Sequence, residues 1–133
     1  MAFSVEERFI IETEKKLGAK FPPDYVKKMM TENGGAVCGP PEVWMLYPIF
    51  DSSDKKRLKR TCNDVVRETQ NAREWPGFPD DAVAIGSNGG GDQLVLLRAK
   101  YATEMLAEEV YWWDHETSEL NMVASRFGDL VKG

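Results

Sequence analysis

The sequence predicts an α+β protein, with N-terminal helices packed on a mostly antiparallel sheet and a short helix near the C-terminus. Apolar residues in the first half recur at steps of three and four, which is the period of a helix. The second half changes to short apolar runs rich in β-branched and aromatic residues, which are typical of strands. The chain has 133 residues, enough to bury one core, so we expect a single domain over residues 1–133.

Two helices are expected at the start of the chain. Ser4 and Glu7 have the spacing of a capping box, in which the two side chains satisfy free amides at a helix start, and Gly18 is placed to end that helix. The proline pair at 22–23 suits the first turn of a second helix, where amide hydrogens have no partner within the helix. The Asn-Gly-Gly run at 33–35 is expected to end it.

The middle of the chain predicts one strand and one long helix. Residues 43–50 are apolar and predict a strand. Pro48 favours an edge position for this strand, because proline has no amide hydrogen to donate to a neighbouring strand. A helix is expected from about 54 to 74. Its buried stripe, at steps of three and four, would consist of Leu58, Cys62, Val65, Thr69 and Ala72.

Three strands and a last helix follow. Residues 82–85, 93–97 and 109–114 predict strands. Between the first two, Asn88 and Gly89 favour a hairpin turn whose two central residues have positive φ. A short helix is expected from about 124 to 131. Helices followed by a mostly antiparallel sheet define the α+β class.

The formal net charge of −5 is concentrated in the second half of the chain. Residues 1–74 carry 13 Lys and Arg against 12 Asp and Glu, whereas residues 75–133 carry 4 against 10, a net charge of −6. An acidic chain disfavours nonspecific binding to nucleic acid or to an anionic membrane. With no secretion signal and no apolar run of membrane-spanning length, we expect a cytoplasmic protein in which Cys38 and Cys62 are reduced thiols.

The motifs do not predict catalysis. The glycine run at 89–91 lacks the Lys-Ser/Thr of a phosphate loop, and Asp92 after it would repel phosphate, so a hairpin loop is expected. Ser87 lacks the surroundings of a nucleophile elbow, because Ile85 stands where that motif needs glycine. We therefore expect no enzymatic activity and no cofactor.

A metal site is not expected either. On an extended segment, Asp114 and Glu116 would point to one side and His115 to the other. One histidine and two separated cysteines are too few ligands for zinc. A hydrolase that uses Asp92, Asp114 and His115 around the glycine loop stays the enzymatic alternative.

Charged and aromatic residues predict a protein-binding face. The basic cluster at 55–60 is expected to be the solvated flank of an amphipathic helix. In the strand at 109–114, alternation places Tyr111 and Trp113 on one face and Val110 and Trp112 on the other, and we expect both faces to be covered. An acidic rim beside aromatic anchors is typical of protein interfaces. The candidate partner-binding residues are Asp80, Asp81, Glu108, Glu109, Trp112, Asp114, Glu116 and Glu119.

Several short motifs occur in a fixed order. Leu-Gly at 17–18, Phe-Pro-Pro-Asp-Tyr at 21–25 and Asn-Gly-Gly at 33–35 come first, followed by Ala-Ile-Gly at 84–86, Gly-Gly-Gly-Asp at 89–92, Asp-His-Glu at 114–116 and Ala-Ser at 124–125. In this order they resemble the SUKH superfamily, which groups fungal cell-wall-synthesis regulators with bacterial immunity proteins. The resemblance implies scaffold roles for Pro22, Gly34, Gly35, Gly89, Gly90 and Asp92.

The resemblance also implies an α+β domain that binds other proteins and has no enzymatic activity. Many bacterial members neutralise a toxin that is encoded beside them, often a nuclease. We therefore expect an immunity protein that lays its acidic second half over a basic cleft of a toxin, with a protein partner and no direct contact to nucleic acid or membrane. A regulatory scaffold of the fungal type is the alternative.

Overall fold

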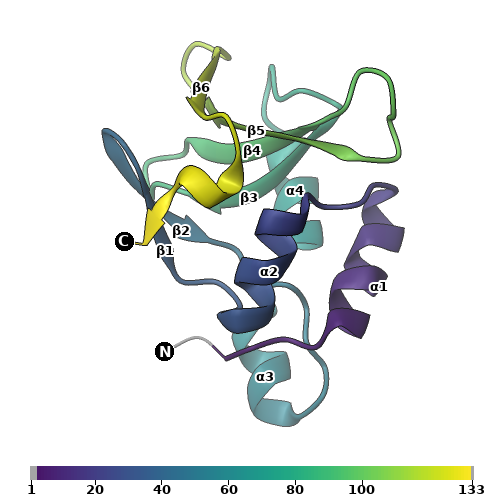
Figure 1. Cartoon of the computed structure of the whole chain (residues 1–133). Coiled ribbons are helices and arrows are strands. Elements are labelled where there is room, and N and C mark those ends of the chain that lie inside the picture. The colour runs from purple at the N-terminus through teal and green to yellow at the C-terminus, as the bar shows by residue number, and fades with distance from the viewer. Residues whose placement is uncertain (1–2, 133) are drawn as a thin grey trace.

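The computed structural model of the chain describes residues 3–132, and Figure 1 shows its helices and strands. Within that range the elements are α1 (Glu7–Leu17), α2 (Pro23–Thr31), β1 (Ala36–Gly39), β2 (Glu42–Leu46), α3 (Lys55–Arg60), α4 (Val65–Ala72), β3 (Ala82–Ser87), β4 (Gln93–Arg98), β5 (Leu106–Trp113), β6 (Leu120–Ala124), the 3-10 helix η1 (Phe127–Asp129) and β7 (Val131–Lys132). This composition confirms the predicted α+β class.

The strands form one sheet in the order β6-β5-β4-β3-β2-β1-β7. Every pairing between these strands is antiparallel, as expected. The predicted strand over 43–50 is shorter, since β2 ends at Leu46. Its predicted edge position is wrong, because β2 lies between β1 and β3, and Pro48 follows the strand without interrupting a ladder.

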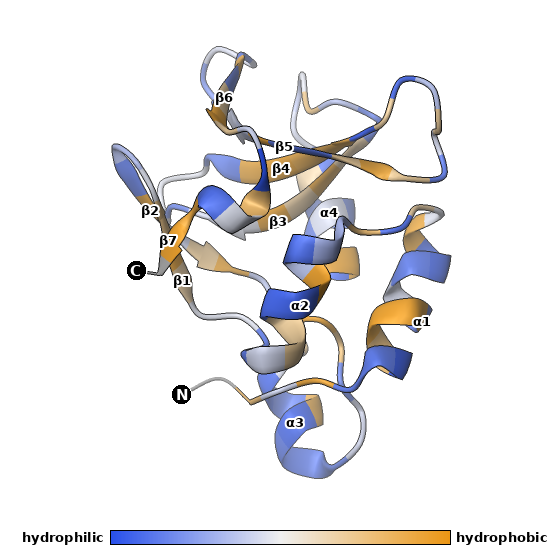
Figure 2. Ribbon diagram, in the orientation of Figure 1, coloured by the Kyte–Doolittle hydropathy of each residue, from blue (hydrophilic) through white to orange (hydrophobic). Residues whose placement is uncertain are grey.

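Apolar side chains cover both faces of the sheet. On one face, residues of α1 and α2 form a core with Ile85, Leu94 and Val110, and Trp112 packs against it. On the other face, Ala72 at the end of α4 and other apolar residues pack around Trp113. The predicted alternation of β5 and the covering of both its faces are therefore confirmed. Figure 2 shows strands β3 and β4 mostly in hydrophobic colours, whereas hydrophilic and hydrophobic stretches alternate along α1 and α2.

The first helix starts differently from the prediction. Its N-cap is Glu6, which makes no side-chain capping bond, and the expected capping box of Ser4 and Glu7 is absent. Gly18 ends the helix as predicted, with φ of 72° and an amide that donates to the carbonyl of Glu14. The start of α2 at Pro23 also follows the prediction.

The predicted long helix over 54–74 is two helices. Thr61 ends α3. Its hydroxyl donates a hydrogen bond to the carbonyl of Arg57 and accepts one from the amide of Asp51. Asp64 then caps α4 by accepting from the amide of Arg67. The predicted stripe is consequently buried only in its second part, at Val65, Thr69 and Ala72, whereas Leu58 and Cys62 are exposed.

Two later predictions also need correction. The hairpin between β3 and β4 is confirmed, but its loop spans residues 88–92 and places Gly89, not Asn88, at positive φ. The predicted helix over 124–131 is the end of β6, the short η1 and β7. No helix in the described range is long and apolar enough to cross a membrane.

Candidate functional site

Two loops meet at one end of the sheet because of its register. β4 starts at Gln93, which pairs with Trp113, the last residue of β5. In an antiparallel pair, the residue before one partner lies near the residue after the other, so Asp92 and Asp114 are neighbours. The turn at 114–119, between β5 and β6, therefore lies beside the glycine loop at 88–92.

The carboxylate of Asp92 holds these loops together. Its Oδ1 accepts a hydrogen bond from the amide of His115 at 3.0 Å and contacts Nδ1 of the same residue at 2.5 Å. Its Oδ2 accepts from Nε1 of Trp112 at 2.9 Å and from the side-chain amide of Asn88 at 3.4 Å. Hydrogen bonds to a carboxylate are stronger than neutral ones, so this group fixes the direction in which the turn leaves β5.

The same contacts set the charge of the pair. Partial burial by itself raises the pKa of Asp92, but the hydrogen bonds from His115 and Trp112 outweigh it and hold that pKa below its ordinary value. The hydrogen bond to Asp92 raises the pKa of the His115 imidazole. Both shifts favour the ionised pair, in which the imidazole nitrogen donates to the carboxylate.

A third loop, at 73–81 between α4 and β3, packs against the same turn. Gly77 has a φ of 84°, and a Cβ there would collide with the side chain of Ser118. The ring of Trp75 meets the His115 ring edge-on, with 5.5 Å between centroids. Trp75 is nevertheless 48% exposed, so a large aromatic surface stands beside the turn. We call Trp75, Asp114, Glu116 and Glu119 the acidic loop surface.

The predicted acidic residues fall into two groups, one in the turn after β5 and the other in the first half of β5 and just before β3. Asp114, Glu116 and Glu119 belong to the turn after the strand. The other group lies at the far end of the sheet, where Ala82 pairs with Leu97 and its neighbour Leu96 pairs with Val110. We call this second group, which consists of Asp80, Asp81, Glu108 and Glu109, the distal acidic group.

The spacing along β5 keeps the two groups apart. Glu109 and Asp114 are separated by five positions, or roughly 16 Å of extended strand. The eight acidic and aromatic residues expected to bind a partner are therefore not one contiguous patch. A single small contact would favour one group over the other.

Trp112, predicted as an aromatic anchor, is half-buried. Its ring meets Trp44 edge-on at 5.7 Å, and its Nε1 is committed to Asp92. Of the tryptophans near the turn, Trp75 offers more surface to a partner. Periodicity provided no signal for Trp75, because Trp75 lies in the loop after α4 and belongs to no helical or strand pattern of apolar residues. The available signal was its place beside Pro76 and Gly77, since an apolar ring in a turn is often exposed.

The structure brings together the three residues of the enzymatic alternative. One oxygen or nitrogen atom from each of Asp92, Asp114 and His115 lies within 4.8 Å of the others, so these three atoms are close enough together to bind one cation. Asp92, however, already accepts the hydrogen bonds described above. Oδ1 of Asp114 accepts a hydrogen bond from the amide nitrogen of Glu116, 2.9 Å away. Ser87 accepts the amide of Gly89 within its own loop. These bonds support a structural use of the cluster.

The fold and this site define a class of protein: a small α+β domain whose loops at one sheet end present carboxylates around an exposed tryptophan. Residues 4–133 match the model of the SMI1 / KNR4 family (SUKH-1), and the chain belongs to that family. No curated protein matches the chain significantly. Membership of this family supports a protein-interaction domain of the immunity type in general. The family match also agrees with the resemblance that the order of the sequence motifs indicated.

Proposed function

We propose that this chain is an immunity protein that neutralises a cognate toxin by binding it through the acidic loop surface. The observation that carries the proposal is the turn at 114–119, which carries three carboxylates, is tied to Asp92 through His115, and packs the His115 ring against the exposed ring of Trp75. Tryptophan is enriched among residues that dominate binding energy, and a polar rim usually surrounds such an anchor.

The partner expected for this surface is a protein with a basic cleft, such as the substrate groove of a nuclease. Opposite charge speeds the encounter and orients the two proteins. The net charge of −6 over residues 75–133 supplies the long-range attraction, to which the distal acidic group contributes. Trp75 and the turn would then make the direct contacts that cover the cleft.

Neutralisation by occlusion needs no catalysis by the immunity protein. The hydrogen bonds that engage Asp92 and Asp114 within the fold support this part of the proposal, because a hydrolase would need those groups for its substrate. Fungal-type regulatory scaffolds also act by binding proteins, and the identity of the bound partner separates the two roles.

The stoichiometry of neutralisation tests the proposal. The chain would be titrated into the toxin encoded by the neighbouring gene, while the activity of that toxin and the heat of binding are measured. Occlusion predicts that the toxin's activity falls in proportion to added chain and reaches its minimum near one equivalent. Loss of activity at a small fraction of an equivalent would indicate an enzyme, and the absence of binding would remove the immunity role.

A further inference from the structure

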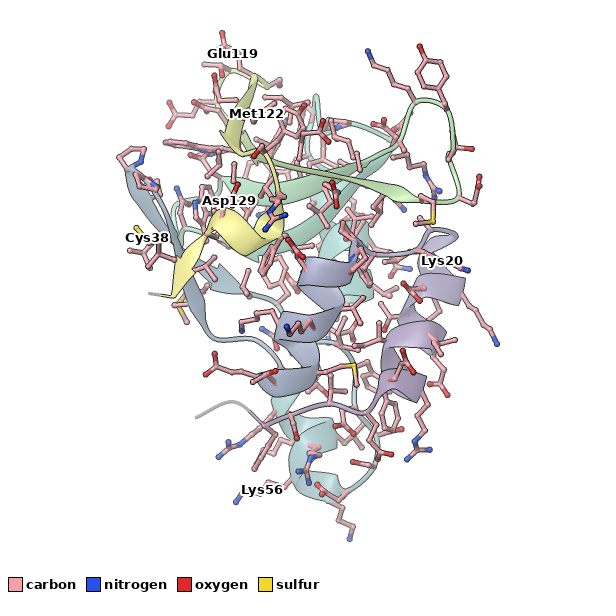
Figure 3. All side chains as sticks on the ribbon, viewed as in Figure 1. Lys20, Cys38, Lys56, Glu119, Met122 and Asp129 are labelled. Carbon is pink, nitrogen blue, oxygen red and sulfur yellow. The ribbon has the colours of Figure 1, made fainter. Side chains whose placement is uncertain are left out.

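The helix α3 is a basic element at the opposite end of the molecule from the acidic loop surface. Five of its six residues are Lys or Arg, and none of the six is buried. From Asp51 to Arg67 the chain carries six Lys and Arg against three Asp, a net charge of +3. Figure 3 shows Lys56 on α3 and Glu119 beside β6 at opposite ends of the view. Lys55, Lys56 and Lys59 are exposed on this helix and can meet a partner.

A polar hollow of about 270 Å³ adjoins this helix. Arg57 and Arg60 line it from α3, Asn63 lines it from the turn before α4, and Gly35 lines it from the turn before β1. Arg57 forms ion pairs with two carboxylates. Its Nε lies 3.7 Å from Oδ2 of Asp51, and its Nη1 lies 2.7 Å from Oδ2 of Asp54. Asp51 also lines the hollow, and the segment from Asp51 to Arg67 keeps its net charge of +3 with these carboxylates counted.

The two guanidinium groups are held over an aromatic ring. The Cζ atoms of Arg57 and Arg60 lie 4.5 and 4.8 Å from the ring centroid of Phe3, and Nζ of Lys56 lies 5.7 Å from it. Cation–π contacts of this kind restrict long side chains before any ligand arrives. A ligand that binds such ordered groups loses less side-chain entropy than one that binds free lysines.

We propose that α3 and this hollow form a second docking surface, which binds an acidic segment of a protein partner. A Glu or Asp carboxylate of the segment enters the hollow beside Arg60 and Asn63, and neighbouring carboxylates meet Lys56 and Lys59 along the helix. Guanidinium suits this role because it can donate two parallel hydrogen bonds to one carboxylate. This surface is independent of the proposed toxin contact, which lies at the other end of the molecule.

The size of the surface favours a peptide over a nucleic acid. Six helical residues span about 9 Å, which accommodates a few carboxylates but only a short stretch of phosphate backbone. Phe3 is covered by guanidinium groups and is not offered for stacking by bases. The net charge of −5 also disfavours a long polyanion.

The test is a fluorescence-anisotropy titration of the full chain. The probes are a labelled peptide of six glutamates and a labelled single strand of six thymidine nucleotides. The wild-type chain should bind the peptide more tightly than the DNA. The double charge reversal Lys56→Glu with Lys59→Glu should weaken peptide binding about tenfold or more. The matched control, Lys15→Glu with Lys100→Glu, makes the same charge change at exposed positions on α1 and beyond β4, and should weaken it less than about threefold.

A substitution that keeps the charge separates a built site from diffuse attraction. Arg60→Lys should weaken binding of the peptide about threefold to fivefold, because it removes the two parallel donors of the guanidinium and keeps the positive charge. Thermal unfolding of each variant checks that it is folded. Tighter binding of DNA, no binding of the peptide, equal losses in control and test variants, or an unaffected Arg60→Lys would each overturn the proposal.

Discussion

The acidic loop surface and the distal acidic group carry similar charge, but they are built differently. In the loop surface, Asp92 fixes the turn at 114–119, and Trp75 adds an exposed ring. In the distal group, Asp80 and Asp81 precede β3 and Glu108 lies within β5, and all three carboxylates are exposed. Charge counted along a sequence therefore locates long-range attraction, whereas a fixed backbone shape beside an aromatic anchor locates a direct contact.

Removing Asp92 should have the largest effect on the loop surface. Asp92→Ala leaves Nε1 of Trp112 and the amide of His115 without their acceptor, which costs about 1–3 kcal/mol in the free energy of unfolding. Urea denaturation measures this loss. The control Asp81→Ala removes an exposed carboxylate of the distal group and should change stability by less than about 0.5 kcal/mol. Equal effects would show that Asp92 does not organise the loops.

Truncating Trp75 should reduce affinity more than stability. Trp75→Ala is expected to weaken toxin binding by about 2 kcal/mol, or roughly thirtyfold, because exposed anchors dominate interfaces. Tyr101→Ala is the aromatic control, since Tyr101 is fully exposed in the loop between β4 and β5. Calorimetric titration measures both variants. If Tyr101→Ala weakened the complex as much as Trp75→Ala, the anchor would be misplaced.

Charge reversal compares the two acidic groups directly. Glu116→Lys with Glu119→Lys and Glu108→Lys with Glu109→Lys make the same change in net charge. Both pairs should slow association, and the first should also raise the dissociation rate about tenfold because it changes direct contacts. Stopped-flow mixing at low and high salt measures the rates. A higher dissociation rate for the second pair alone would assign the contact to the distal group.

The ion pair of Asp92 and His115 predicts a small pH dependence of stability. The raised pKa of His115 stabilises the fold below its ordinary value of 6.5, and this contribution is lost as pH rises through the folded-state pKa. The lowered pKa of Asp92 stabilises the fold above its ordinary value of 3.8 and is lost as pH falls. The wild type should therefore exceed His115→Gln in unfolding free energy most between about pH 4 and 6.5. A difference that grew toward about pH 9 would contradict this sign.

The sequence predicted most of the fold where a regular period or a glycine decides the local structure. The first two helices, the strands β3, β4 and β5 and the α+β class followed from such signals. The break between α3 and α4 was missed because Leu58 and Cys62 continue the apolar period although they are exposed. Asp64, a helix N-cap, was the signal for the break. Gly128 likewise argued against a helix over 124–131.

The candidate site was harder to predict because it depends on register. Asp92 and His115 are 23 positions apart, and they meet only because Gln93 pairs with Trp113. The length of the loop between β4 and β5 sets that register, and no pattern in the sequence reveals it. An assumed extended conformation for residues 114–116 separated His115 from its neighbours, whereas the chain turns there and brings its ring to Asp92.

Hydrogen exchange of the toxin complex would show whether the turn at 114–119 and the loop that carries Trp75 make the contact with the toxin. Amide exchange would be compared for the free chain and for its one-to-one complex with the toxin that the proposed function requires. Binding should slow exchange in the turn at 114–119 and in the loop at 73–78, with little change at 80–81 and 106–109. Slowed exchange confined to 80–81 and 106–109 would contradict this expectation and would assign the interface to the distal acidic group.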